Sequence, residues 1–270
     1  MEPVHENFTT DGIFRRIAEA TASVTGGDFL RALLARLCDV LQIRYAFIAE
    51  FIDNASTARV LAWWDGESYA AEDEYLLAGT PCECVLDGAL HCFTDGVAEQ
   101  FPEEHELIEL GIRSYMAVPL INAASTVLGH LAIMDTRPMI GSPRDRHVFR
   151  IFGAMAGAEL QRKHIEEALL ASERSLARVI GSAPDAIVTL DAHLRVASFN
   201  PAAVRIFGAY DGEVRGSDFG RCLSPELREA LLTQMGQPLN VVRWSPPGLS
   251  ALRADGSPFP VEYTLAALEP

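Results

Sequence analysis

The chain has little basic charge and almost no lysine. Among its 270 residues, 22 are Lys or Arg and 37 are Asp or Glu, which gives a formal net charge of −15, and Lys163 is the only lysine. Residues 1–160 hold 24 acidic and 11 basic side chains. Phosphate contacts need clustered Lys and Arg, so this charge argues against nucleic acid or an anionic membrane as a direct partner. Schiff-base chemistry and Walker-type phosphate binding would have a single lysine to use.

Long apolar runs and a cysteine framework are also absent. No stretch approaches the roughly 20 uninterrupted apolar residues that span a bilayer, and residues 1–7 have neither the basic region nor the apolar core of a secretion signal. Five cysteines are an odd number, and with 49% hydrophobic residues the chain can bury a core without disulfides. We therefore expect a soluble, cytoplasmic chain with one large domain or two of ordinary size.

Apolar periodicity in the first 160 residues predicts helices and antiparallel strand pairs. Steps of three and four residues indicate helices at 14–18 and 29–41, and helix-end signals outline a third at 102–110. Pro102 is expected at the first position of the last of these, followed by glutamates in its first turn. Apolar runs of strand length predict two β-hairpins, 45–51 with 57–63 and 114–120 with 126–134. Between the hairpins, residues 65–100 are irregular and rich in Gly, Asp and Cys, which is typical of a binding face.

A helix that begins at Pro143 is predicted to continue well beyond the first domain. No other proline occurs before Gly181. An apolar stripe in its first turns consists of Val148, Ile151, Phe152 and Met155. Farther along, a stripe with seven-residue spacing consists of Ala158, Ile165, Ser172 and Val179, with Leu169 and Leu176 alongside. This second stripe predicts a two-stranded seam, and therefore a homodimer joined through a coiled-coil linker at 161–182.

The second half repeats the mixture of helices and antiparallel strands. A hairpin is predicted at 186–190 with 194–199, helices at 202–207 and 225–232, and strands at 249–253 and 259–267. The chain shows no β-α-β alternation, so the predicted class is α+β with antiparallel sheets in both domains. We expect a first domain over 1–160, the linker helix over 161–182 and a second domain over 183–270.

Two groups of motifs resemble known families. Over 11–160 the element order resembles a GAF domain, together with Gly79-Thr80-Pro81-Cys82-Glu83, Gly111-Ile112-Arg113-Ser114-Tyr115 and Val127-Leu128-Gly129-His130-Leu131. Residues 173–268 resemble a PAS domain through Ser182-Ala183-Pro184-Asp185, Phe199-Asn200-Pro201 and Ala254-Asp255-Gly256-Ser257. The resemblance implies a sensory input array of a bacterial signalling protein, such as a sensor histidine kinase, whose pockets bind small molecules or mediate contacts.

The PAS resemblance also implies a sheet of five strands, of which the sequence supplies four. We therefore expect that the second domain lacks its last strand, or that it borrows one, with residues 239–245 as a local substitute. No histidine-phosphorylation box, GGDEF run or Walker site is present. Any output domain is expected beyond Pro270 or in another protein.

Thiols and histidines are the candidates for chemistry. Cys82, Cys84, His91 and Cys92 are four potential soft ligands, but their spacing lacks the paired arrangement of metal sites, so we expect no metal. One GAF subfamily, the free methionine-R-sulfoxide reductases, uses cysteine nucleophiles, yet no cysteine occurs between Phe101 and Leu120, where the resemblance would place the catalytic one.

The binding site is expected between the sheet and the irregular segment 65–100. The residues predicted near it are Trp63, Cys82, Phe93, Tyr115 and His130. A haem ligand is one role for His130, and a hydrogen-bonded core imidazole is the other. The predicted function is ligand sensing without catalysis, with ligand and cofactor unknown. The alternatives are a small GAF-type enzyme, such as the sulfoxide reductase, or a purely structural dimerisation module.

Overall fold

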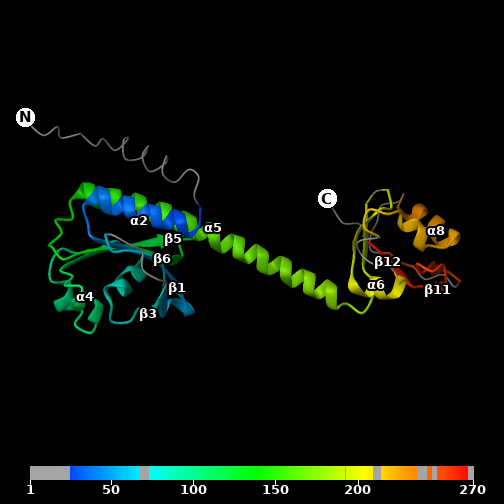
Figure 1. Cartoon of the computed structure of the whole chain (residues 1–270), viewed down its shortest axis with the longest axis horizontal. Helices are drawn as coiled ribbons and strands as arrows, with labels where there is room; N and C mark the ends of the chain where they lie inside the picture. The colour runs from blue at the N-terminus through cyan, green and yellow to red at the C-terminus, as the bar shows by residue number, and fades with distance from the viewer. Residues whose placement is uncertain are drawn as a thin grey trace, which may run out of the picture. The chain divides into compact units, whose positions relative to one another are not determined.

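The computed structural model describes residues 25–66, 73–191, 193–208, 214–235, 242–244 and 248–266. The chain divides into two compact units, Met1–Ala168 and Leu169–Pro270. The boundary between the units falls inside one long helix, Pro143–Ser182, and within the range 161–182 that we predicted for the linker. The helix predicted at 14–18 lies outside the described residues. Figure 1 shows both units.

The first unit contains one antiparallel sheet of six strands in the order β3-β2-β1-β6-β5-β4. Its strands are β1 Tyr45–Ile52, β2 Thr57–Trp64, β3 Glu74–Leu76, β4 His91–Phe93, β5 Ser114–Ile121 and β6 Val127–Asp135. The two predicted hairpins, β1–β2 and β5–β6, are confirmed. Strand β6 also pairs with β1, which joins the two hairpins into a single sheet.

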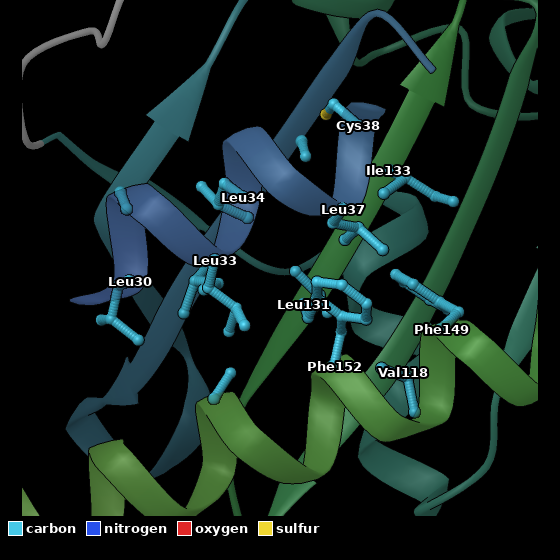
Figure 2. Close-up of a cluster of buried hydrophobic side chains, with 14 of the residues drawn as sticks. Leu30, Leu33, Leu34, Leu37, Cys38, Val118, Leu131, Ile133, Phe149 and Phe152 are labelled. Carbon is cyan, nitrogen blue, oxygen red and sulfur yellow. The ribbon is translucent and has the colours of Figure 1, made fainter. Parts of the chain in front are cut away.

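Helices cover one face of this sheet. The two helices are α2, Gly27–Leu41, and α5, Pro143–Ser182, and Figure 1 shows them along the same side of the strands. Helix α2 buries Leu30, Leu33, Leu34 and Leu37, which recur at three- and four-residue steps and so form one stripe. They pack with Phe149 and Phe152 of α5 over Leu131 and Ile133 of β6 (Figure 2).

Shorter elements cover the opposite face. They are the 3-10 helix η2 Pro81–Asp87, α3 Val97–Gln100 and α4 His105–Glu109, and a further 3-10 turn, η1 Asp53–Ala55, connects β1 to β2. Their buried side chains include Cys82, Val85, Val97 and Leu107. The predicted start of α4 at Pro102 is wrong: the Glu104 N–H donates to the Phe101 carbonyl at 3.1 Å, so Pro102 lies in a turn before the helix.

The long helix α5 is packed only along its first part. Its buried residues end at Leu160. Val148 and Phe152 of the predicted stripe are buried, and Met155 is half-buried but packs against the core. The stripe omitted Phe149 and Ala156, which are buried, whereas Ile151 is half-buried. Gly153 permits this close packing, since a Cβ there would lie 2.6 Å from Val118 Cγ1 of β5. In the part of the chain that the structure describes, no helix combines the length and apolar character needed to cross a membrane.

The second unit is built from three two-stranded antiparallel ladders and short helices. Strand β7 Val188–Leu190 pairs with β8 Val196–Phe199, β10 Ser250–Leu252 with β11 Pro258–Pro260, and β12 Tyr263–Leu265 with β9 Val242–Trp244. Its helices are α6 Pro201–Phe207, η3 Phe219–Cys222 and α8 Pro225–Met235. Its core gathers Val196, Phe199, Phe207, Phe219, Leu227 and Ala251.

The C-terminal strand differs from its prediction. The expected single strand over 259–267 is two strands with different partners, because Pro258 and Pro260 have no N–H to continue a ladder. Residues 242–244, from the segment predicted as a local substitute, pair with β12. That the domain lacks its fifth strand stays a prediction.

Candidate functional site

A cavity of about 460 Å³ lies in the first unit, on the face of the sheet that η2 and α4 cover. Strands β1, β2, β5 and β6 supply its sheet side, and η2, α4 and the turn before α4 supply the other side. Strand β3 contributes Tyr75 at one edge. Pockets of this volume hold small organic molecules.

Aromatic rings form much of the wall. The lining includes Tyr45, Phe47, Trp63, Tyr75 and Tyr115. Phe47 and Trp63 are stacked with their ring centres 5.1 Å apart, and Phe47 meets Tyr75 edge-to-face at 6.5 Å. These contacts fix the ring planes, so the wall offers a rigid apolar surface to a ligand.

Hydroxyl and thiol groups of the lining are paired with one another and with the imidazole of His130 behind it. The Tyr115 hydroxyl donates to Cys82 Sγ at 3.2 Å, and the Tyr75 hydroxyl lies 3.2 Å from His130 Nε2. Burial raises the pKa of the Cys82 thiol, although Tyr115, Tyr75 and Thr80 act in the opposite direction. Cys82 is therefore a neutral thiol, which is a poor nucleophile.

His130 is fully buried on β6 between Phe47 and Phe51. Its ring stacks on Phe51 at 5.5 Å and meets Phe47 edge-to-face at 5.2 Å. Its Nδ1 has no hydrogen-bond partner within the described residues. Burial lowers the pKa of His130 to about 3, so the ring is neutral at physiological pH.

Acidification from pH 7 to pH 5 is expected to destabilise the first unit by about 2 kcal/mol through this histidine. The reason is that His130, with a pKa of about 6.5 in the unfolded chain, becomes protonated there, whereas the buried ring of the folded domain stays neutral. The loss begins as the pH falls below the unfolded value and grows toward the folded value of about 3. Urea unfolding at both pH values measures it. His130→Gln should reduce the pH dependence, while the exposed control His105→Gln should retain it. Equal pH dependence in all three proteins would contradict the assignment.

Three of the five predicted site residues, Trp63, Cys82 and Tyr115, line the cavity. Phe93 packs behind it against Phe101, with ring centres 5.3 Å apart, and His130 lies behind Tyr75. Binding by these residues stays a prediction. Sequence reasoning missed Tyr45, Phe47, Glu104 and Glu106, all of which line the cavity. Alternation along the strand beginning at Tyr45 could have identified the first two, because Tyr45 and Phe47 share a face.

The remaining thiols and histidine of the 82–92 segment do not converge. The His91 Nε2 lies 2.9 Å from Asp87 Oδ2, whereas Cys92 packs in the core on the opposite face. Across the described ranges, no three His, Cys, Asp or Glu side chains form a group that could hold a metal ion.

Comparison with known proteins assigns both units. A family model described as a GAF domain matches residues 11–160, which is more than half of the chain. The chain belongs to the GAF family. A second model, described as a PAS fold, matches residues 180–240, so a PAS domain follows the GAF domain, as the motifs predicted. This pair of domains supports a sensory signalling module. No curated protein matches the sequence.

Solved structures similar to this chain include several GAF domains. The GAF domain of a phosphoenolpyruvate-protein phosphotransferase from Coxiella burnetii is 15% identical, with 58% of this chain and 95% of that chain covered and a TM-score of 0.49. A methyl-accepting chemotaxis protein, residues 122 to 287, is 18% identical, with coverages of 58% and 99% and a TM-score of 0.46. The chromophore-binding domain of a bacteriophytochrome from R. palustris is 12% identical, with coverages of 62% and 65% and a TM-score of 0.48.

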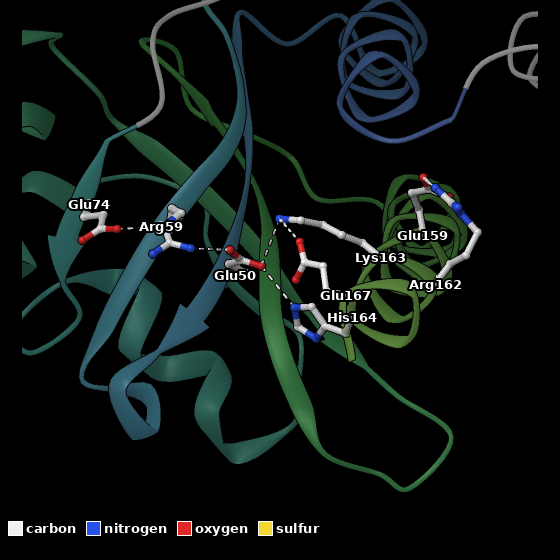
Figure 3. Close-up of polar contacts among 8 residues, drawn as sticks. All are labelled: Glu50, Arg59, Glu74, Glu159, Arg162, Lys163, His164 and Glu167. Carbon is white, nitrogen blue, oxygen red and sulfur yellow. Dashed lines mark hydrogen bonds and ion pairs between the residues drawn. The ribbon is translucent and has the colours of Figure 1, made fainter. Parts of the chain in front are cut away.

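A buried carboxylate joins the GAF sheet to α5. The Glu50 side chain on β1 is 5% exposed, and it accepts from Arg59 Nη1 at 3.1 Å and lies 3.1 Å from His164 Nε2 and 3.5 Å from Lys163 Nζ (Figure 3). Burial acts to raise the pKa of Glu50, but the contacts with His164, Lys163 and Arg59 outweigh it and lower the pKa. Glu50 is therefore ionised and holds α5 where its buried part ends.

Proposed function

We propose that this chain is the cytoplasmic sensory input part of a bacterial signalling protein, in the manner of a sensor histidine kinase, with no catalysis of its own. The GAF cavity binds a small molecule, and α5 relays the change to a downstream output domain within a homodimer. The cavity of about 460 Å³ with its aromatic wall carries this proposal, because pockets of this size and lining suit small organic ligands.

A chain of ion pairs supports the relay. Tyr75 lines the cavity, and its neighbour Glu74 accepts from Arg59 Nε at 2.8 Å. Arg59 in turn contacts Glu50, which holds Lys163 and His164 of α5. A shift of β3 on ligand binding would therefore change the contacts of Glu50 with Lys163 and His164, and so displace α5 at the turn where it leaves the sheet.

The far end of the same helix is tied to the PAS domain. The Asn200 side chain donates to the carbonyls of Ile180 and Asp185, at 3.1 and 3.0 Å, and accepts from the Ala203 N–H as the cap of α6. A movement of α5 would therefore reach α6 and the hairpin β7–β8 through one buried side chain.

The alternative of a cysteine-based reductase receives less support from the thiols. Burial raises the pKa of Cys82, of Cys84 and of Cys92, which keeps the nucleophilic thiolate scarce near neutral pH. If the chain were such a reductase, mass spectrometry after incubation with free methionine sulfoxide would reveal oxidised cysteine.

Filling the cavity is expected to abolish ligand binding while the GAF domain stays folded. Leu110 lines the cavity after α4, so Leu110→Trp should remove the stabilisation that a bound metabolite gives in a thermal-shift screen. Ile108→Trp is the matched control, because Ile108 is 54% exposed and does not line the cavity. A compound that raises the Tm of both variants equally would place its binding elsewhere and refute the cavity as the sensor site.

A further inference from the structure

The mouth of the GAF cavity carries excess negative charge. Asp65, Asp73, Glu104 and Glu106 line it together with one cation, Arg44, so these five side chains have a formal charge of −3. The Arg44 guanidinium lies over the Tyr45 ring, 5.1 Å from its centre, so a ring of this wall already carries a cation on its face. The lining therefore has more carboxylates than its own cation, Arg44, can neutralise.

Glu104 and Glu106 are the least compensated of these acids. Neither carboxylate has a hydrogen bond or ion pair with any residue in the described ranges, whereas Asp73 accepts from the Glu74 N–H. Burial raises the pKa of Glu106, and the charges of Glu104, Asp73 and Glu109 raise it further. Carboxylates that repel one another beside a cavity are stabilised when a cation enters it.

Two observations favour an organic cation over a metal ion. Among the residues whose positions are described, no group of three metal-ligating side chains comes together here or elsewhere. The deeper walls are aromatic, and ring faces attract an ammonium group while contacting the carbon body that carries it.

We propose that the GAF cavity selects an organic cation with an apolar body, such as an arylalkylammonium compound. Its charge lies at Glu104 and Glu106, and its body lies against Phe47, Trp63 and Tyr75. The inference rests on the proposed function, since it names the ligand class of the same cavity. The excess negative charge of residues 1–160, with 24 acidic and 11 basic side chains, also attracts cations to the domain.

Three probes of one shape test the charge preference by isothermal titration calorimetry on the full chain. They are phenethylammonium, which is a cation, phenethyl alcohol, which is neutral, and hydrocinnamate, which is an anion. We expect the cation to bind at least about tenfold more tightly than the alcohol, and the anion to bind most weakly, because a charge-assisted contact is stronger than a neutral one.

Amide variants locate the charge. Glu104→Gln combined with Glu106→Gln should weaken binding of phenethylammonium by about tenfold and leave phenethyl alcohol unchanged. Glu103→Gln is the matched control, since Glu103 directly precedes Glu104, is exposed and does not line the cavity. All three positions are half-buried or exposed, so the amides should leave the fold intact, which the Tm checks.

The outcomes separate the ligand class from the function. Equal or tighter binding of the alcohol or the anion, lost in Leu110→Trp, would overturn the cation preference and leave the sensory cavity standing. Cation binding that the Glu104→Gln, Glu106→Gln variant retains in full would also overturn it. If none of the three probes binds at millimolar concentration, the cation preference is overturned as well, and the metabolite screen with Leu110→Trp alone decides the proposed function.

Discussion

Gly129→Ala is expected to unfold the GAF domain under conditions in which the unmodified protein stays folded. Gly129 lies in β6, opposite Glu50 of β1 and Leu120 of β5, in the middle of the sheet. A Cβ at this position would lie 2.1 Å from the Ala49 carbonyl oxygen and 2.9 Å from Glu50 Cα. Both are backbone atoms of the neighbouring strand, so no side-chain rotation relieves the overlap, and β1 must separate from β6.

The expected loss is about 3 kcal/mol or more, at the upper end of what overpacking in a core produces. Urea denaturation followed by the fluorescence of Trp63 and Trp64 measures it. Gly157→Ala is the control, because the nearest atom to a Cβ there is 3.6 Å away and alanine favours the helix by up to about 1 kcal/mol. Similar unfolding midpoints for the two variants would show that β1 and β6 approach less closely than described.

If the chain forms the proposed homodimer, Ile165→Glu and Leu169→Glu are each expected to convert it to monomers. Beyond Leu160 no residue of α5 is buried, and the side chains of the predicted seam are exposed: Ile165 60%, Leu169 58%, Leu176 61% and Val179 65%. Their spacings of four, seven and three residues place them on one side of the helix, where a partner helix would cover them. A buried, unpaired carboxylate in such a seam should weaken association by at least about 100-fold.

Sedimentation velocity of the full chain over a concentration series measures this change. Arg174→Glu is the matched control, because position 174 lies on the opposite side of the helix from the seam and should keep the dimer. Small residues at Ala158 and Ser172 allow two helices to approach closely, so the effect should be strongest between them. Variants that stay dimeric while both domains remain folded would place the interface outside α5.

Local patterns were enough to predict the longer elements of both domains, but the segment predicted as irregular, 65–100, also contains the short elements β3, η2, β4 and α3. The hairpins β1–β2, β5–β6 and β7–β8 and the continuous helix from Pro143 follow from periods of two and of three to four residues, which act between neighbours in sequence. The ends of the elements were less predictable. Pro102 is typical of a helix start, yet it lies in the turn before α4. Strand β11 ends at Pro260, although the apolar pattern continues beyond it.

The site shows the same division between local and tertiary information. The turns and thiols of 65–100 indicated where a cavity would be, and three of the residues predicted near it, Trp63, Cys82 and Tyr115, line it. Nothing local indicated that Glu104 and Glu106 of the α4 region would face rings of β1 and β2, because about 40 residues or more separate them in the chain.

Pairing of β6 with β1 was decided only by the tertiary structure. The hairpins predict β1 beside β2 and β5 beside β6, but any of several edges could have joined them. Joining β1 to β6 buries His130 between Phe47 and Phe51 and places Glu50 under Lys163 and His164 of α5. Strand order depends on which apolar faces can be covered together by α2, α5 and the η2–α4 layer, and that requirement acts over the whole domain rather than along the chain.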